Sequence, residues 1–391
     1  MSNILILTSY YLGASTANGI CAKNIAKHFE QEGHNVCILC YDQGLIEKNV
    51  HTVPMPRNVS SQSKFIKLWK CFKAVFTPPI NKKLVCEYKR QAIKICFEHN
   101  IDTVVCMFFP IETLSVISKI KSQFPQIHTV VYELDSVGDG ISSGSGYRNL
   151  VNHTIERWIG KQYRKSDRII VMDSHSCYWK KKFERKHGHK LVFADIPVLV
   201  AKHIPPICKE ESDTISFLYG GMIQQEYRSP DHLLAVFDDY AKQHNAVLDF
   251  YSKGDCEDKI AKFAEHVEGI KQNGYVPEAV LDEAIAKADA LVSIGNKISR
   301  SIPSKLITYL SYGKPVIHIS SQQDDPCIKY LEHYPLGLVL YEWDSVKNNS
   351  YKLDKFMCDA KGKMVDFSNV AISLCKNTPA YSANLILEKQ I

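Results

Sequence analysis

The residues of this chain best suited to chemistry lie in a short segment of its second half, residues 301–317, which reads SIPSKLITYLSYGKPVI. Pro303 favours the first turn of a helix, because its ring fixes a helical φ and it has no N–H to leave unpaired. The other N–H groups of a first helical turn have no partner within the helix, and Lys305 lies beside them in the sequence. Such N–H groups next to a lysine are a natural seat for a diphosphate, with Ser304 and Thr308 on the same helix.

A second set of candidates follows two predicted strands earlier in the same half. Gly220 and Gly221 would make a turn after the first of these strands, and Arg228 comes shortly after that turn. A fixed cation at this point can neutralise the charge that develops on a departing diphosphate, with little need for a metal. Lys253 follows the second strand and is a further cation of this kind. For Arg228 an exposed loop arginine is an equally simple interpretation, and for Lys253 a surface lysine is the simpler one.

The loop after the first predicted strand, residues 10–19, reads YYLGASTANG and is rich in small residues. Small side chains let backbone N–H groups approach a phosphate or a sugar closely. The glycines do not have the G-x-G-x-x-G spacing of a dinucleotide site, so a nicotinamide cofactor is not supported. The candidate residues of this acceptor-side or phosphate-binding loop are Gly13, Ser15, Asn18 and Gly19.

Asp135 stands at the carboxyl end of another predicted strand, where a carboxylate could orient or deprotonate an acceptor hydroxyl. An N-cap for the following helix is an equally open role for this aspartate.

Four glycines between residues 138 and 146 suit either a lid over the acceptor or a plain flexible loop. The chain has no Asp-x-Asp triplet, and its H-x-H at residues 187–189 indicates a solvated turn. We therefore predict no metal site.

The elements that must position these residues alternate along nearly the whole chain, as short β-rich apolar runs and longer helical patterns. Such alternation predicts parallel sheets covered by helices. A proline-containing junction at residues 196–213 separates a domain at 1–200 from a domain at 213–370. Residues 371–391 have a helical pattern and could pack back on the first domain. The predicted fold class is α/β, with two Rossmann-like doubly wound domains that face a central cleft.

Four stretches of the sequence share their order and motifs with a known family. The most specific is Pro-Ser-Lys at residues 303–305 with Gly-Lys-Pro-Val-Ile at 313–317. The others are FLYGGMIQQEYRSP from residue 217, LDFYSKGD from residue 248 and YVPEAVLDEAIAKADALVSI from residue 275. Together they resemble the donor-binding domain of GT-B glycosyltransferases of the retaining, family-4-like type.

The resemblance implies a GT-B fold and a nucleotide-sugar donor held in the second domain by residues that include Arg228 and Lys305. It also implies a metal-independent hexosyltransferase without a cofactor. The acceptor would be a glycan or a lipid-linked molecule, transfer would retain the anomeric configuration, and the pathway would be cell-surface polysaccharide biosynthesis.

Two positions depart from that family's pattern. Retaining members usually carry two glutamates eight positions apart in this segment, and the aligned residues here are Arg300 and Thr308. The donor ribose could be held by other groups, the donor could differ, or the site could be degenerate, and Thr308 could equally be an ordinary helix-surface residue. An alternative function is a catalytically inactive binding subunit of a glycan-assembly complex. A sugar-nucleotide epimerase of the same fold is a further alternative.

The two halves of the chain carry opposite net charge. Residues 1–200 hold 27 Lys and Arg against 16 Asp and Glu, whereas residues 201–391 hold 21 against 26. Much of the excess lies in residues 64–94, where basic and apolar residues interleave as in helices that lie on anionic membranes. A sheet-packed helix with a lysine-rich outer side is the alternative, and no nucleic-acid-binding motif accompanies the charge. The predicted membrane patch comprises Lys64, Lys67, Trp69, Lys70 and Lys73.

The thirteen cysteines indicate a reducing compartment, because they are scattered and several stand in apolar runs. Cys37 and Cys40 form a C-x-x-C, but within a strand their side chains would point to opposite faces. No cleavable leader is recognised, and no apolar run reaches the ~18 residues that span a bilayer. We expect a cytoplasmic protein, with peripheral attachment to the inner face of the cell membrane as an option.

Overall fold

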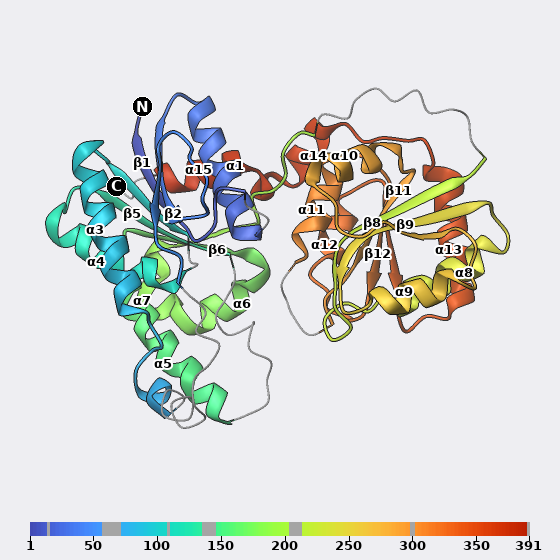
Figure 1. The fold of residues 1–391 in the computed structure, drawn as a ribbon, viewed down its shortest axis with the longest axis horizontal. Helices are drawn as coiled ribbons and strands as arrows, with labels where there is room; N and C mark the ends of the chain where they lie inside the picture. Colours follow the sequence, from blue (N-terminus) through green and yellow to red (C-terminus); the bar gives the residue numbers. More distant parts are fainter. Residues whose placement is uncertain are drawn as a thin grey trace. The chain divides into compact units, whose positions relative to one another are not determined.

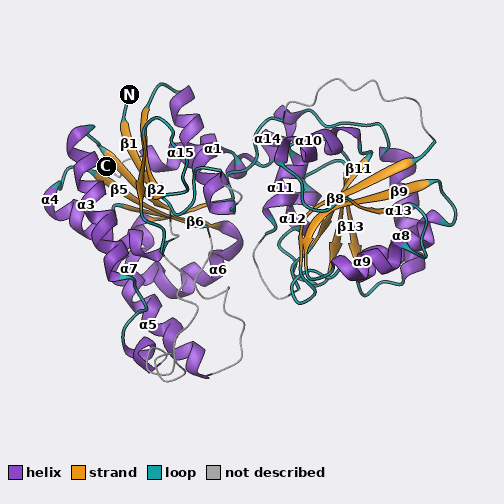
Figure 2. Ribbon diagram, in the orientation of Figure 1, coloured by secondary structure: helices purple, strands orange, loops and turns teal. Residues whose placement is uncertain are grey.

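The structure, a computed structural model, describes residues 1–13, 16–56, 72–107, 110–134, 146–202, 213–297 and 302–388. The chain divides into two compact units (Figure 1). Unit 1 comprises Met1–Val198 together with Lys376–Ile391, and unit 2 comprises Leu199–Cys375. In each unit the strands form a central layer with helices around it (Figure 2).

Unit 1 is built on a seven-stranded sheet in which every neighbouring pair of strands is parallel. The strands lie in the order β3-β2-β1-β4-β5-β6-β7, so the direction of winding reverses between β1 and β4. Residues 4–7 of β1 are all fully buried, as expected of a strand covered on both faces. The strands are β1 Asn3–Leu7, β2 Asn35–Tyr41, β3 Val50–Val53, β4 Thr103–Met107, β5 His128–Glu133, β6 Arg168–Met172 and β7 Leu191–Ala194.

Helices cover both faces of this sheet. Leu5 and Leu7 of β1 belong to a core that α3 and α4 cover, so Ile4 and Ile6 face the opposite side. α1 and α15 pack against one another. The main helices of unit 1 are α1 Ala17–Gln31, α3 Lys82–Glu98, α4 Leu114–Gln123, α5 Gly146–Tyr163, α6 Ser176–Trp179, α7 Arg185–His187 and α15 Pro379–Leu387.

The last helix, α15, is bonded to the sheet of unit 1. The hydroxyl oxygens of Tyr132 on β5 and Ser382 on α15 lie 2.9 Å apart in a buried hydrogen bond. Nη1 of Arg168 on β6 donates to the carbonyl oxygen of Leu385 over 3.0 Å and pairs with Glu388 at 2.9 Å. The end of the chain therefore completes the unit that its beginning forms.

Unit 2 repeats the architecture with a six-stranded sheet that is parallel throughout, in the order β10-β9-β8-β11-β12-β13. Its strands are β8 Ile215–Ile223, β9 Ala246–Gly254, β10 Ile270–Gln272, β11 Ala290–Ile294, β12 Val316–Ser320 and β13 Gly337–Tyr341. Its helices are α8 Asp231–Ala241, α9 Glu257–Ala264, α10 Glu278–Lys287, α11 Ser304–Leu310, α12 Ile328–Glu332, α13 Val346–Ala360 and α14 Phe367–Ser373.

The two parallel sheets confirm the predicted α/β, doubly wound fold class. The sequence pattern does not predict the strands β3 and β10, which lie at sheet edges and are only four and three residues long. An edge strand needs little apolar sequence, and β10 reads IKQ, so no periodicity reveals it.

Glycines with a positive φ come shortly after two of the helices. Gly33 follows α1 with a φ of 80°, and Gly313 follows α11 with a φ of 70°, a backbone conformation that costs glycine little. A Cβ on Gly313 would lie 2.2 Å from the carbonyl oxygen of Val365, so this position also needs the missing side chain. None of the helices in the described ranges is both long and apolar enough to cross a membrane.

Candidate functional site

Unit 2 brings two polar side chains together where its strand order reverses, between β8 and β11. Doubly wound sheets bind ligands at the carboxyl ends of their strands at such a switch point. Arg228 follows β8 and Asn296 follows β11, and Nε of Arg228 donates to Oδ1 of Asn296 over 2.7 Å. This hydrogen bond spans the switch point, which makes it the centre of the candidate site.

A short backbone turn holds Arg228 in place. Gln224 and Arg228 form an isolated antiparallel bridge just past the end of β8, and the N–H of Arg228 donates to the carbonyl oxygen of Gln224 over 2.6 Å. The N–H of Lys297 donates to the carbonyl oxygen of Tyr227 over 2.8 Å. The turn after β8 is thereby tied to the segment after β11, so Arg228 is fixed from both strands.

Tyr219 of β8 lies beside the guanidinium of Arg228. Burial raises the pKa of Tyr219, and Arg228 offsets part of that rise. The phenol is therefore neutral at pH 7, and its hydroxyl donates to the carbonyl oxygen of Met222 over 3.0 Å. Among the described residues Arg228 makes no ion pair, so its charge is available to an anionic ligand.

Asn296 is braced by the loop after β12. Nε2 of Gln322 donates to the carbonyl oxygen of Asn296 over 2.7 Å. A buried pair anchors the same loop, with Nε2 of His318 2.9 Å from Oδ2 of Asp325. Burial by itself would raise the pKa of Asp325, but the hydrogen bond and electrostatic attraction of His318, together with hydrogen bonds from Cys327, outweigh it and the pKa is lowered. The loop thus holds Asn296 beside Arg228 through a part-buried hydrogen bond that a fully buried pair supports.

Lys305 lies on α11 beside the same strand end. A Cβ placed on Gly221 would lie 3.9 Å from Cγ of Lys305, so the lysine stem passes next to the backbone of β8. In the part of the chain that the structure describes, its Nζ makes neither a hydrogen bond nor an ion pair. The nearby carboxylates of Glu278 and Asp282 pair instead with Lys202, at 3.4 and 3.7 Å. Burial lowers the pKa of Lys305, and a half-buried cation without a partner among the described residues is a candidate for binding an anion.

The prediction that Gly220 and Gly221 form a turn is wrong. Both lie within β8, which continues to Ile223. The hydroxyl of Tyr309 on α11 accepts from the N–H of Gly220 over 2.7 Å and donates to its carbonyl oxygen over 3.0 Å. A Cβ on Gly220 would lie 3.0 Å from Cδ1 of Leu281, which is tight contact. Glycine is used here so that α10 and α11 can approach the strand closely.

The other predicted donor residues of unit 2 have simpler surroundings. Lys253 near the end of β9 is exposed, and its Nζ lies 3.9 Å from the ring centroid of Tyr275. Ser304 begins α11, and Oγ1 of Thr308 donates to the carbonyl oxygen of Ser304 over 3.1 Å. The hydroxyl of Thr308 is therefore used within its own helix.

The predicted loop of unit 1 is described in part. Gly13 is exposed with a φ of 56°, and the N–H of Gly19 donates to Oγ1 of Thr16 over 3.2 Å as part of the α1 cap. Oδ1 of Asn18 is buried and has no hydrogen-bond partner among the described residues.

Lys73 lies on an exposed helical turn at residues 72–76. Seven predicted positions lie outside the described residues, namely Ser15, Lys64, Lys67, Trp69, Lys70, Asp135 and Arg300.

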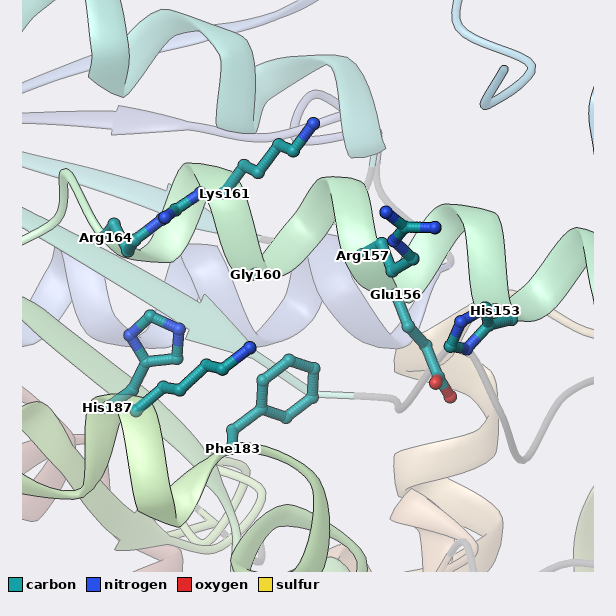
Figure 3. A pocket seen from close by; sticks show the side chains of 9 residues that line it. His153, Glu156, Arg157, Gly160, Lys161, Arg164, Phe183 and His187 are labelled. Atoms are coloured by element: carbon teal, nitrogen blue, oxygen red, sulfur yellow. The ribbon is translucent and has the colours of Figure 1, made fainter. Parts of the chain in front are cut away.

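A basic hollow of about 410 Å³ lies elsewhere in unit 1, between α5 and the helical segment that ends in α7 (Figure 3). Arg157, Lys161, Arg164 and Lys186 line it, and none of these cations has an ion pair among the described residues. His187 also lines the hollow, and its buried Nδ1 has no hydrogen-bond partner in the described part of the chain. These groups suit an anionic ligand.

The interpretation of residues 187–189 as a solvated turn is wrong for His187, which is only 1% exposed. Its ring packs against Tyr163 and Phe183, with centroids 6.0 and 6.2 Å away. Burial lowers the pKa of His187, and neighbouring cations lower it further. The sequence gives no sign of this burial, because the two aromatic partners come from other turns and helices.

Two groups of side chains in the described ranges could hold a metal ion. They are Cys37, His51 and His99 in unit 1, and His318, Asp325 and Cys327 in unit 2. In the second group His318 and Asp325 bond to one another, and burial raises the pKa of the Cys327 thiol well above its usual value. That group therefore supports the loop at the switch point rather than offering a thiolate.

Sequence reasoning missed Asn296 and Tyr219. Asn296 stands two residues after the carboxyl end of a strand that the sequence pattern does predict. A polar residue at that place could have marked it as a candidate. Its significance depends on β11 lying next to β8, and that neighbour relation is not local in the sequence.

A comparison with protein-family models finds no match, and a comparison with curated proteins finds none either. Solved structures do match over nearly the whole chain. HepE from Anabaena in complex with UDP is 13% identical, with a TM-score of 0.62, and the match covers 99% of this chain and 98% of that one. WaaG, described as a glycosyltransferase involved in lipopolysaccharide biosynthesis, is 15% identical, with a TM-score of 0.58 and coverage of 98% and 99%.

Sucrose-phosphate synthase from Thermosynechococcus elongatus is 10% identical, with a TM-score of 0.61 and coverage of 99% and 95%. Identities this low establish architecture rather than activity, but the agreement extends through both units. Two parallel, doubly wound sheets that match these enzymes from end to end show that this chain has the GT-B fold.

Proposed function

We propose that this protein is a glycosyltransferase that moves a sugar from a nucleotide-sugar donor to an acceptor. The observation that carries the proposal is the Arg228–Asn296 hydrogen bond across the switch point of unit 2, next to Lys305, whose Nζ has no partner among the described residues. Two similar structures support the donor class, since HepE is solved with UDP-glucose and a starch synthase with ADP.

In this proposal the nucleoside diphosphate of the donor lies against Arg228 and Lys305. Both cations are preorganised, because Asn296 orients the guanidinium and β8 confines the lysine stem. They neutralise the charge that builds on the leaving diphosphate, which is electrostatic catalysis that needs no metal ion. Gly221 beside Lys305 leaves room for the donor, and Ser304 and Lys253 complete its surroundings.

We propose transfer with retention, in which the leaving phosphate helps to deprotonate the acceptor on the same face of the sugar. Asp135 would orient the acceptor hydroxyl, and the loop with Gly13 and Asn18 would contact the sugar or phosphate. The unpartnered Oδ1 of Asn18 supports that role, because a buried acceptor atom without a donor is costly.

The proposed acceptor is a glycan or a lipid-linked molecule of cell-surface polysaccharide synthesis, met on the cytoplasmic face of the membrane. The basic hollow around His187 supports an acceptor that carries phosphate. Phe72 and Phe76, exposed by 66% and 69% on either side of Lys73, support contact with an anionic membrane surface.

Calorimetric titration with a panel of nucleotide-sugars tests the donor site. Arg228→Ala and Lys305→Ala should each weaken donor binding about tenfold or more, because each removes a charge-assisted contact. Lys271→Ala is the matched control, since this exposed lysine lies on the edge strand β10 and should leave binding unchanged. Wild-type protein that binds no nucleotide-sugar contradicts the proposal.

A second candidate function is a binding subunit without transferase activity. It is favoured by Thr308, which stands where retaining members have a glutamate and spends its hydroxyl on the carbonyl oxygen of Ser304. Such a subunit binds the donor but neither transfers nor hydrolyses its sugar. Release of the nucleoside diphosphate by wild-type protein, lost in Lys305→Ala, decides for the enzyme.

A further inference from the structure

Three side chains with nitrogen and sulfur donors meet in unit 1. Cys37 lies on β2, His51 on β3, and His99 directly follows α3. Their ligand atoms, the thiol sulfur and one ring nitrogen from each histidine, all lie within 4.8 Å of one another. The two imidazole rings are 5.5 Å apart between centroids and inclined by 70°.

The strand register explains why these side chains share one face of the sheet. His51 of β3 pairs with Leu39 of β2, and Cys37 is two residues before Leu39, so all three face the same side. Cys37, Leu39 and Val53 belong to the core that α3 covers. His99 caps the carboxyl end of that helix and so completes the group.

The group lies away from the carboxyl ends of the strands. Cys37 is the third residue of β2 and His51 the second residue of β3, and the two strands are parallel. Both positions are therefore close to the amino ends, whereas the loops that bind substrates in doubly wound sheets follow the carboxyl ends. An ion bound by these three side chains would therefore serve a purpose other than catalysis.

One thiol and two imidazoles are a donor set for Zn²⁺ and unsuited to Mg²⁺ or Ca²⁺, which take oxygen ligands. Zinc bonds of about 2.3 Å to sulfur and about 2.0 Å to nitrogen put tetrahedral ligand atoms roughly 3.3–3.6 Å apart. The ligand atoms lie within 4.8 Å of one another, so binding of the ion would draw them closer together. His99 is exposed, which leaves the fourth position open to water.

The surroundings of His51 support a cation at this point. Its Nε2 is buried and has no hydrogen-bond partner among the described residues, a costly state that a metal bond relieves. Lys94 and Glu98 on the last turns of α3 pair at 3.8 Å, so their charges offset each other.

We propose that Cys37, His51 and His99 bind one Zn²⁺ ion, with water as the fourth ligand. Cys37 gives up its thiol proton to solvent on binding, and no oxidation or reduction takes place. The ion ties the edge strand β3 to β2 and to the end of α3, so its role is to stabilise unit 1. This site is independent of the proposed sugar transfer.

The test uses the full-length chain, freed of metal by a chelator and titrated with Co²⁺ as a spectroscopic stand-in for zinc. A tetrahedral site with a thiolate gives a sulfur-to-cobalt charge-transfer band and intense visible bands, and Zn²⁺ should abolish both by competition. Cys37→Ser should remove the charge-transfer band, and His51→Ala and His99→Ala should weaken binding by about tenfold or more, as even loss of an outer partner does. Cys86→Ser, at an exposed cysteine on the same helix α3, is the matched control and should leave the titration unchanged.

Thermal unfolding provides a second measurement. Free Zn²⁺ at about 100 times its Kd should raise the unfolding temperature of unit 1 by roughly 5–10 °C, and His99→Ala should lose this shift. Because His99 is exposed, that variant folds even if Cys37→Ser does not. A cobalt complex without a thiolate band, or an equal zinc shift in wild type and His99→Ala, overturns the proposal.

Discussion

At the scale of single residues, the candidate site depends on two cations that have no ion pair within the described ranges. Arg228 is held by neutral partners, Asn296 and Tyr219, and the carboxylates near Lys305 are bound to Lys202. A carboxylate partner would have stabilised either cation but would compete with an anionic ligand. Neutral hydrogen-bond partners orient a charge without cancelling it, which is what a diphosphate site requires.

The hydroxyl of Tyr309 offers a residue-scale prediction. It satisfies both backbone groups of Gly220 inside the core, so Tyr309→Phe leaves a buried N–H and a buried carbonyl without partners. We expect unit 2 to lose about 1–3 kcal/mol of unfolding free energy, measured by denaturant unfolding.

Tyr240→Phe is the control for this prediction. Tyr240 is also buried in unit 2, at 1% exposure, but its hydroxyl has no hydrogen-bond partner among the described residues. Removing it should leave stability unchanged or slightly raised, because no bond is lost and a desolvated oxygen is removed. Equal losses in the two variants would mean that the Gly220 bonds contribute nothing.

At the scale of elements, helix α11 determines the geometry of the candidate site around Lys305. Its position depends on Gly220, which lets Tyr309 reach the backbone of β8, and on Gly313, which ends the helix. Lys314, the next residue, donates to the carbonyl oxygens of Ala286 and Ala288 at the end of α10, over 2.6 Å each. The Gly-Lys-Pro part of the motif is thus explained by packing, whereas the half-buried Nζ of Lys305 has no partner in the described part of the chain.

Gly313→Ala tests this account of the helix end. The substitution combines a positive φ with a Cβ only 2.2 Å from the carbonyl oxygen of Val365, and we expect a loss of about 2–4 kcal/mol in unfolding free energy. Gly362→Ala has a φ of 78° but no atom within 4 Å of its Cβ, so it should cost only about 1–2 kcal/mol. Chemical denaturation of the two variants measures the difference, and equal losses would show that the contact with Val365 is unimportant.

At the scale of the whole molecule, the chain leaves unit 1 to form unit 2 and returns to it at Lys376. The returning helix α15 contributes Ser382 to a buried hydrogen bond with Tyr132, and Glu388 to an ion pair with Arg168. Unit 1 therefore cannot be completed until the entire chain is present.

Truncation after Asn377 should accordingly destabilise unit 1 and leave unit 2 intact. Loss of α15 exposes the surface of α1 that it covers and leaves the hydroxyl of Tyr132 without Ser382. In calorimetry we expect the unfolding transition of unit 1 to move down by several degrees, with donor binding to unit 2 retained. Parallel loss of donor binding would show that the units do not fold separately.

The fold class and the most specific motif could be read from the sequence alone. Alternating apolar runs and helical patterns are local signals, and they correctly predicted two parallel α/β sheets. Lys305 could also be selected as a candidate from the sequence, because Pro-Ser-Lys at a helix start is a contiguous pattern. The short edge strands β3 and β10 lacked any such signal.

Only the tertiary structure decided which residues meet. Arg228 and Asn296 are 68 positions apart and join because β11 pairs with β8, a choice made by strand order and not by either segment. Cys37, His51 and His99 are likewise distant in the sequence, and they meet because β2, β3 and α3 bring them to one end of a sheet. Gly220 was wrongly predicted to form a turn. Glycine is needed there because Tyr309, from a helix far along the chain, hydrogen-bonds to its backbone. Local sequence encodes the elements, whereas long-range packing of those elements creates the sites.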